Sequence, residues 1–168
     1  DVKTRYMKIA ETAAKHLKGA RTRTYYRKRF FELMWMGVLS PASPVLANMG
    51  TDRGMPVSCS GQYIGDGVDE FYTNLHEAAM LSKNSFGTSG YFGDIRDRDA
   101  AITGGGKANG ARPVIEDFFT AAAKISHGGM RVGSFAAYVP MGSSVYDECV
   151  KSLHLDHKGK NYGWNITD

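Results

Sequence analysis

Apolar residues recur at helical spacing near the start of the chain. From residue 2 to residue 18 they form one face of a predicted helix, which Gly19 can stop. The members of that face are Val2, Tyr6, Ile9, Ala10, Ala13 and Leu17. A second helix is predicted from about Thr24 to Met36. Pro41 and Pro44 then end helical structure and extend the chain.

The rest of the chain alternates helical and strand-like patterns. Residues 43–59, "SPVLANMGTDRGMPVSC", are expected to be extended on each side of a turn at 50–54. Helices are predicted from Val68 to a stop at Gly87, and over 114–126 after Pro113. "SFAAYVP" (134–140) and the closing "YGWNITD" are strand-like. Residues 87–113 predict a long loop with short extended pieces, and the polar stretch 142–160 predicts no definite element.

Strands that alternate with helices, after a helical pair, indicate an α/β unit with parallel strands. Three or four strands are too few to close a barrel.

Composition adds broad limits to this picture. The 168 residues are 42% hydrophobic and 23% charged, as in a globular chain. The longest apolar runs are shorter than a membrane span, and no secretory leader opens the chain, so we expect a cytoplasmic protein without a membrane partner. Two cysteines cannot build a disulfide scaffold and are expected to be free thiols or a redox pair.

The net charge of +4 fits an anionic ligand such as a nucleotide, but it equally fits proteins that bind nothing negative. Much of it lies in the run from Lys18 to Arg29, where a solvated helix face is favoured over a nucleic-acid patch. We therefore predict no nucleic-acid partner.

Glycine is abundant, at 20 residues, and is concentrated between Gly87 and Gly133. "GGGKANG" (104–110) is not a Walker loop, because Ala108 follows Lys107, and it is not a Rossmann motif, because Asn109 replaces the third glycine. A flexible or anion-cradling loop is still compatible with this sequence.

Two other loops carry arginines that could meet phosphate. Arg96 and Arg98 in "GDIRDRD" have the fork that suits phosphate oxygens, but spacing alone favours ion pairs with the neighbouring aspartates. His127 and Arg131 in "SHGGMRVGS" fit a solvated helix cap and a base-reading loop equally well.

A buried cysteine is more often inert packing than a reactive group. Cys59 lies between Ser58 and Ser60, and this polar neighbourhood modestly raises the chance of a redox role. Cys149 lies in "YDECVKS", a segment to which the sequence assigns no element. "HLDH" (154–157) is read as a polar loop, so no metal site is predicted.

Four stretches, taken in order, resemble the catalytic (large) subunit of ribonucleotide reductase. They are "LSPASPVLANMGTDRGMPVSC", "GDGVDEF", "GTSGYFGDIRDRDAAITGGGKANGARPVIEDFF" and "AAAKISHGGMRVGSFAAYVP". The resemblance implies an α/β fold in which N-terminal helices (1–40) precede the first half of a ten-stranded α/β barrel (41–168).

The resemblance also implies roles at the substrate. Cys59 would donate reducing equivalents to the ribose and form a disulfide with a cysteine of the other half-barrel. Ser43 and Ser58 would line the substrate pocket, and Arg131 would reach the substrate base or phosphates.

A second set of implied roles concerns a nucleoside triphosphate effector. Asp66 would hold its sugar hydroxyl, Arg96 its phosphates with Arg98 assisting, and His127 would lie in the second specificity loop. Thr103 stands where a basic residue is common in the family, and His127 where glutamine is common.

Finally, the resemblance implies partners. They are a ribonucleotide substrate, a deoxynucleoside triphosphate effector, the C-terminal half of the subunit, a thioredoxin- or glutaredoxin-type reductant, and a second copy of the chain. No cofactor is expected in this chain, because the radical source would be a metal-containing small subunit or cobalamin. The chain alone is expected to be inactive, and the alternative is a non-catalytic nucleotide-binding regulatory module.

Overall fold

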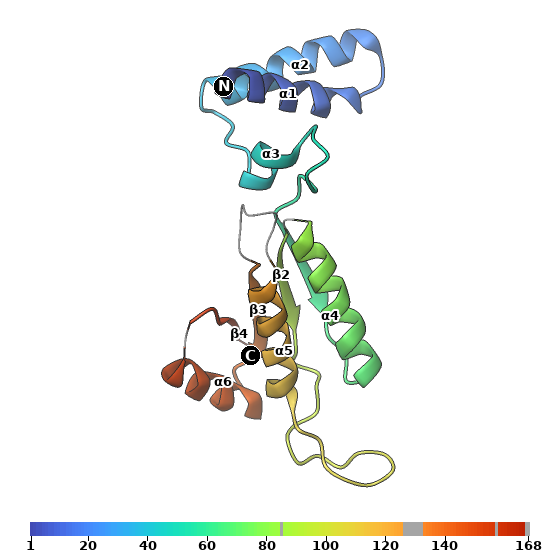
Figure 1. The fold of residues 1–168 in the computed structure, drawn as a ribbon, viewed down its shortest axis with the longest axis vertical. Coiled ribbons are helices and arrows are strands. Elements are labelled where there is room, and N and C mark those ends of the chain that lie inside the picture. Colours follow the sequence, from blue (N-terminus) through green and yellow to red (C-terminus); the bar gives the residue numbers. More distant parts are fainter. Residues whose placement is uncertain (85, 126–132, 157, 167–168) are drawn as a thin grey trace. The chain divides into compact units, whose positions relative to one another are not determined.

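The computed structural model describes residues 1–84, 86–125, 133–156 and 158–166, which fall into two compact units, residues 1–58 and 59–168 (Figure 1). Each unit is described by itself. The predicted domain boundary at residue 40 lies inside the first unit. Within the described ranges, every helix is too short or too polar to cross a lipid bilayer.

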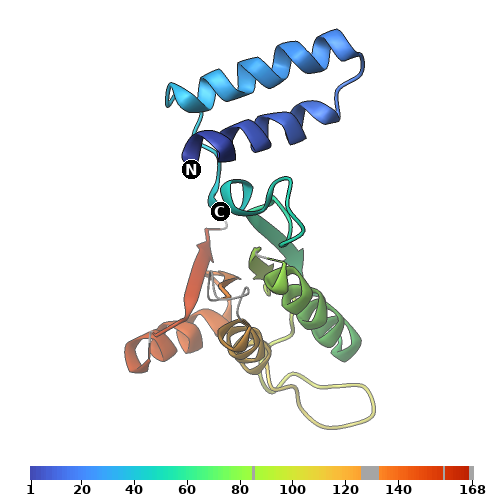
Figure 2. The ribbon, with the colours of Figure 1, turned by 45° about the horizontal axis from the view of Figure 1, so that its top comes forward.

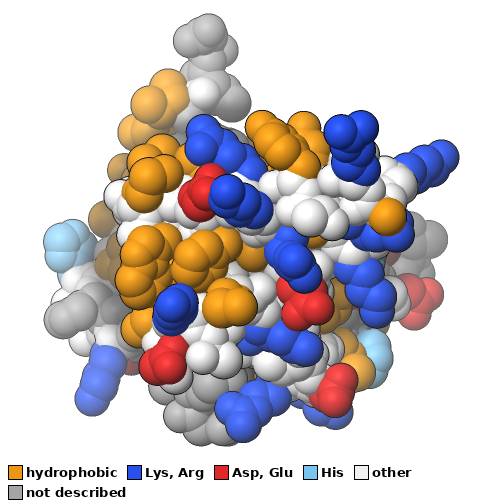
Figure 3. Space-filling view, turned by 90° about the horizontal axis from the view of Figure 1, so that it is seen from above, with side chains coloured by type: hydrophobic (Ala, Val, Ile, Leu, Met, Phe, Trp, Pro, Cys, Tyr) orange, Lys and Arg blue, Asp and Glu red, His pale blue; other side chains and the backbone are white. Residues whose placement is uncertain are grey.

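The first unit contains three helices, α1 (Val2–Lys15), α2 (Ala20–Trp35) and α3 (Ser43–Asn48). The predicted helical pair is confirmed, although α2 begins at Ala20 rather than near Thr24. Its small core gathers Ile9 and Ala10 of α1 with Met34 of α2. The basic residues between 18 and 29 are exposed, as expected of a solvated helix face. Figure 3 looks onto this unit and shows Lys and Arg side chains spread among apolar ones.

The predicted extended segment after Ser43 is wrong, because residues 43–48 form α3. Pro44 occupies its first turn, where a missing N–H costs nothing. The guanidinium of Arg5 donates hydrogen bonds to the backbone carbonyls of Leu46 and Met49, at 2.5 and 2.7 Å. Arg5 thus satisfies the end of α3 from about forty residues away in the chain.

The second unit is a four-stranded parallel sheet in the order β1-β2-β3-β4. Its strands are β1 (Cys59–Tyr63), β2 (Gly87–Tyr91), β3 (Phe135–Pro140) and β4 (Asn161–Asn165). The helices α4 (Val68–Lys83), α5 (Ala111–Lys124) and α6 (Ser144–Leu155) connect successive strands. This confirms the predicted α/β class with a parallel sheet. Figure 2 shows α4 and α5 side by side, with the long loop after β2 beyond their ends.

Three predicted boundaries were wrong in this unit. The helix α4 ends at Lys83, and Gly87 opens β2 instead of closing the helix. The helix α5 begins at Ala111, with Pro113 inside its first turn, and ends at Lys124. The stretch 142–160, for which the sequence predicts no definite element, contains α6, which buries Val145, Cys149 and Ser152 at helical spacing.

The core lies between the sheet and its helices. Phe118 of α5 packs against Phe92 and Phe135, with ring centroids 5.4 and 4.8 Å apart. Alternate strand residues are buried on this side, including Thr88 and Gly90 of β2. Cys59, Gly61 and Tyr63 of β1 alternate with them and are exposed, so none of the described helices covers the opposite sheet face.

Candidate functional site

A cavity of about 590 Å³ lies beside the carboxyl ends of β1 and β2. It is bounded by the start of α4, the loop after β2 and the first turns of α5, all within the second unit. Its polar lining residues are Asp66, Arg96, Thr103, Lys107, Asn109 and Asp117. Its apolar lining includes Val68, Phe71, Tyr72, Ile102, Pro113 and Val114. A cavity with an apolar wall and a few charged groups can hold a ligand with a flat apolar part and an anionic part.

Two residues predicted as effector contacts meet at this cavity. The Nε of Arg96 donates to Oδ2 of Asp66 at 2.6 Å, and its Nη1 donates to the carbonyl of Ala101 at 3.4 Å. Asp66 sits between β1 and α4, where Gly65 and Gly67 flank it. The N–H of Gly65 donates to the Glu70 carboxylate at 3.2 Å, which ties this turn to the first turn of α4.

The expectation that the arginines of "GDIRDRD" pair with its own aspartates is wrong. Arg96 pairs with Asp66, and Arg98 pairs with Glu148 of α6 through two hydrogen bonds of 2.8 and 3.1 Å. The aspartates find other partners, namely Tyr63 for Asp94, Ser144 for Asp97 and Lys107 for Asp99. Apart from Lys107, these partners lie 30 or more residues away in the chain, so spacing could not reveal them.

Arg98 does not line the large cavity. Its side chain contacts α6 instead. Its hydrogen bonds raise the pKa of the Arg98 guanidinium and lower the pKa of the Glu148 carboxyl below its usual value. Next to it, the Ser144 hydroxyl donates to Asp97. Together these two contacts tie the start of the loop after β2 to the start of α6.

The loop after β2 folds back on itself as a short hairpin, residues 99–108. The N–H of Asp99 donates to the carbonyl of Ala108 at 2.9 Å, and the N–H of Ala108 donates to the carbonyl of Ala100 at 2.8 Å. Ala101 and Lys107 form a bridge between its two arms. Gly104, Gly105 and Gly106 all have positive φ at the tip, a conformation that other residues rarely adopt. The anion-cradling loop considered for "GGGKANG" is therefore a hairpin that borders the cavity.

Cys59 occupies the first position of β1 and is exposed as a free thiol. Its partner in the register is Gly87, which has no side chain to cover the sulfur. Further along the same sheet face, Tyr63 and Tyr91 stack with centroids 6.3 Å apart. The Tyr63 hydroxyl donates to Asp94 at 2.6 Å, and this hydrogen bond to the carboxylate raises the pKa of Tyr63.

The other thiol, Cys149, is fully buried in α6, where burial raises its pKa. It is a packing residue between α6 and the core. Among the described Cys, His, Asp and Glu residues, no cluster of three that could hold a metal ion is found. His154 lies on α6, and His157 is outside the described residues.

The remaining predicted substrate residues that the structure describes, Ser43 and Ser58, lie in the first unit. Ser43 is exposed at the first position of α3, and Ser58 is half-buried at the end of the first unit. Because each unit is described by itself, a pocket shared by Ser43 and Cys59 stays a prediction. Arg131 and His127 lie outside the described residues.

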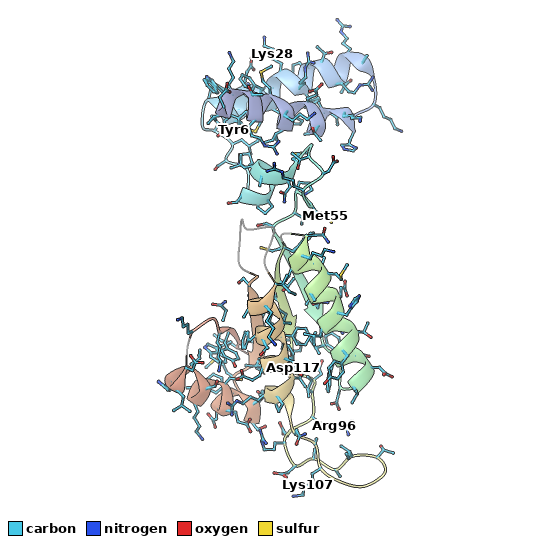
Figure 4. All side chains as sticks on the ribbon, in the orientation of Figure 1. Tyr6, Lys28, Met55, Arg96, Lys107 and Asp117 are labelled. Atoms are coloured by element: carbon cyan, nitrogen blue, oxygen red, sulfur yellow. The ribbon has the colours of Figure 1, made fainter. Side chains whose placement is uncertain are left out.

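Sequence reasoning missed two residues that line the cavity, Lys107 and Asp117, and a third, Glu148, that lies outside it. Lys107 lines the cavity, but its sequence context, "GGGKANG", does not match a known phosphate-binding motif. Asp117 lines it from α5, and Glu148 holds Arg98 from α6. Neither carboxylate lies in a recognisable motif, so no local signal could have found them. Figure 4 shows Arg96 and Lys107 on the loop after β2 and Asp117 on α5.

Comparison with known families gives two matches along the chain. The model described as "Ribonucleotide reductase, all-alpha domain" matches residues 1–54. The model described as "Ribonucleotide reductase, barrel domain" matches residues 57–144, which is about half of the chain.

Individual relatives agree with these matches. The chain is 32% identical over 121 residues to ribonucleoside-diphosphate reductase large chain 2 of Saccharomyces cerevisiae, covering 70% of this chain and 14% of the yeast protein. It is 32% identical over 113 residues to the vitamin B12-dependent ribonucleoside-diphosphate reductase of Mycobacterium tuberculosis, covering 67% and 16%. The solved class Id ribonucleotide reductase alpha subunit of Actinobacillus ureae is similar with a TM-score of 0.78 and 34% identity, over 96% of this chain and 29% of that one. The chain thus spans a small part of the length of these relatives.

Proposed function

The chain belongs to the ribonucleotide reductase large-subunit family, and from this premise we propose that it supplies the first part of a catalytic barrel that reduces ribonucleotides. In this proposal Cys59 is one of the two thiols that deliver electrons to the substrate. The remainder of the subunit supplies the radical cysteine and the second thiol.

In the proposed reaction, reduction of the ribose is coupled to oxidation of two thiols. A thiyl radical takes a hydrogen atom from the ribose, the 2′-hydroxyl leaves as water, and a dithiol is oxidised to a disulfide while the sugar gains two electrons. At the end of the cycle the cysteine gives its hydrogen atom back to the sugar, and the thiyl radical is regenerated. Cys59 suits the dithiol role because a thiol near the surface of a sheet can meet both a substrate and an external reductant.

The observation that carries this proposal is the position of Cys59. It stands at the start of β1 on the sheet face that α4, α5 and α6 leave uncovered, beside a glycine in the next strand. In a barrel built from such a sheet, that face would line the interior. Ser43, Ser58 and Arg131 complete the proposed substrate pocket.

The test compares two cysteine variants. The chain is combined with the remainder of the large subunit and a radical source, and deoxyribonucleotide formation is measured with a dithiol reductant. We expect Cys59→Ser to abolish turnover and Cys149→Ser to retain it, because Cys149 is a packing residue. Normal turnover by Cys59→Ser would refute the role.

The large cavity supports a second part of the proposal, a site for a deoxynucleoside triphosphate effector. Asp66 would accept a hydrogen bond from the sugar hydroxyl, and Arg96 would bind the phosphates. His127 would contribute from the second specificity loop. Arg98 would assist indirectly, because its hydrogen bonds to Glu148 hold the loop that carries Arg96.

One alternative function uses the same cavity without catalysis. In a nucleotide-binding regulatory module, Asp66→Ala would weaken binding of a deoxynucleoside triphosphate, whereas Cys59→Ser would have no effect on function. The paired charges in the cavity support binding in either case, so the cysteine variant separates the two functions.

The partners follow from the reductase proposal. We propose that the chain works in the cytoplasm with a second copy of itself and a thioredoxin- or glutaredoxin-type reductant. A metal-containing small subunit or cobalamin would start the radical, and the presence of a vitamin B12-dependent protein among the relatives keeps both sources open.

A further inference from the structure

We propose that Lys107 is a second phosphate-binding cation of the large cavity and that Asp99 is the counter-ion it exchanges for the ligand. The proposal rests on the proposed nucleotide site. It concerns residues to which neither the family resemblance nor the sequence motifs give a role.

The hairpin 99–108 fixes the backbone of Lys107 at the edge of the cavity. Its bridge to Ala101 and the two hydrogen bonds between Asp99, Ala100 and Ala108 hold the two arms together. The side chain of Lys107 lines the cavity, and its ammonium lies 3.3 Å from the Asp99 carboxylate. A flexible four-carbon stem lets the ammonium move while the backbone stays in place.

Arg96 is tied to the same hairpin. Its Nη1 donates to the carbonyl of Ala101, which is the residue opposite Lys107 in the bridge. The two cations of the cavity therefore share one backbone frame. Arg96 and Lys107 both line the cavity, together with Asp66, Asp117 and several apolar side chains. Two cations beside apolar residues match a ligand with an extended phosphate chain and a flat, less polar group.

The ion pair between Lys107 and Asp99 is easy to exchange. Their side chains are 70% and 64% exposed, so water screens the attraction and the pair contributes little to stability. A triphosphate carries several negative charges and strong acceptor oxygens, so it competes well with one exposed carboxylate for the ammonium. Asp99 would hold Lys107 near the cavity in the free protein and release it on binding.

The backbone at Asp99 gives a clean way to test this exchange. Its φ is +67°, and among the described residues it is the one non-glycine residue with a positive φ. Asparagine tolerates this left-handed conformation as well as aspartate does. Asp99→Asn therefore removes the charge while it leaves the hairpin geometry in place.

The experiment measures binding of the four deoxynucleoside triphosphates and of the matching uncharged deoxynucleosides to the full chain by calorimetry. We expect Lys107→Gln to weaken triphosphate binding by about tenfold, leave nucleoside binding unchanged and reduce the salt dependence of affinity. Asp99→Asn should strengthen triphosphate binding, because the competing carboxylate is gone. Lys107→Arg should restore most of the affinity.

Lys83→Gln is the matched control, since Lys83 is exposed at the end of α4 and does not line the cavity. Equal triphosphate affinity for Lys107→Gln and the unmodified chain, with Asp66→Ala still weakening binding, would overturn the role of Lys107 and leave the nucleotide site standing. If the unmodified chain binds none of the triphosphates, the proposed effector site itself fails.

Discussion

Arg96 and Asp66 form an ion pair of 2.6 Å although thirty residues separate them in the chain. Asp66 follows β1 and Arg96 follows β2, and the two strands are parallel neighbours. Loops at the carboxyl ends of adjacent parallel strands meet at one edge of the sheet, where α/β proteins commonly bind ligands. The pair thus lines the large cavity at this edge of the sheet.

This ion pair is expected to matter more for binding than for folding. The two side chains are 39% and 28% exposed, so we expect Asp66→Asn to lower the free energy of unfolding by less than about 1 kcal/mol. The same variant should weaken triphosphate binding clearly, because an amide replaces a charged acceptor. Urea unfolding and calorimetry on the same preparations measure both quantities, and a large loss of stability would show that the pair is mainly structural.

The contact between Arg98 and Glu148 predicts a dependence of stability on pH. Arg98 lowers the pKa of Glu148 in the folded state, so this contact stabilises the fold at pH values above the ordinary glutamate pKa. The contribution is lost as the pH falls through the lowered pKa, because the carboxyl is then protonated in both states. Glu148→Gln should therefore be less stable than the unmodified chain near neutral pH, and the difference should shrink under acid conditions.

Chemical unfolding measured across that acid range tests this expectation. Glu77→Gln is the control, since Glu77 is exposed on α4 and has no ion-pair partner among the described residues. A difference between Glu148→Gln and the unmodified chain that stays constant with pH would contradict the assignment.

The two thiols should react at very different rates. Cys59 is exposed, whereas Cys149 is buried and burial raises its pKa, so less thiolate forms and reagents cannot reach it. We expect iodoacetamide to label Cys59 in the folded chain and Cys149 only after denaturant is added. Mass spectrometry of the peptides reads out both sites, and Cys59→Ser should abolish labelling under native conditions. Rapid native labelling of Cys149 would mean that α6 is not packed as described.

A pair of glycine variants tests which face of the sheet the helices cover. A Cβ at Gly90 would lie 3.0 to 3.2 Å from Phe135, Phe92 and Ile64, so Gly90→Ala should destabilise the fold by about 1–3 kcal/mol. Among the described residues, a Cβ at Gly61 would meet only the Ser89 hydroxyl, at an ordinary 3.4 Å. Gly61→Ala should thus be close to neutral. Equal destabilisation in urea unfolding would argue against an uncovered face at β1.

Local pattern was enough to predict much of the secondary structure. The strand "SFAAYVP" corresponds to β3, and the helices predicted from Val2, Val68 and Val114 correspond to α1, α4 and α5 apart from their ends. These elements place apolar residues at a regular period against a large core, so each can be recognised from a short window. The α/β class with a parallel sheet follows from their order.

The segments that were misread depend on distant contacts. Residues 43–48 are helical in a structure where Arg5 of α1 binds the carbonyls at the end of that helix. Half of the residues of α6 are polar, and one of them, Glu148, is bound by Arg98 from another loop. A short or polar segment has a weak preference of its own, so its partners decide its conformation.

The sequence by itself determined the periodic elements, the parallel α/β class and the family resemblance, because these follow from residue types at fixed spacing along the chain. Only the tertiary structure decided that Arg96 faces Asp66, that Arg98 binds Glu148 instead of a neighbouring aspartate, and that Lys107 borders the same cavity. Charged side chains have many possible partners within reach in the chain. The fold selects one partner for each, because it brings the carboxyl ends of β1 and β2 together and places the start of α6 beside the loop after β2.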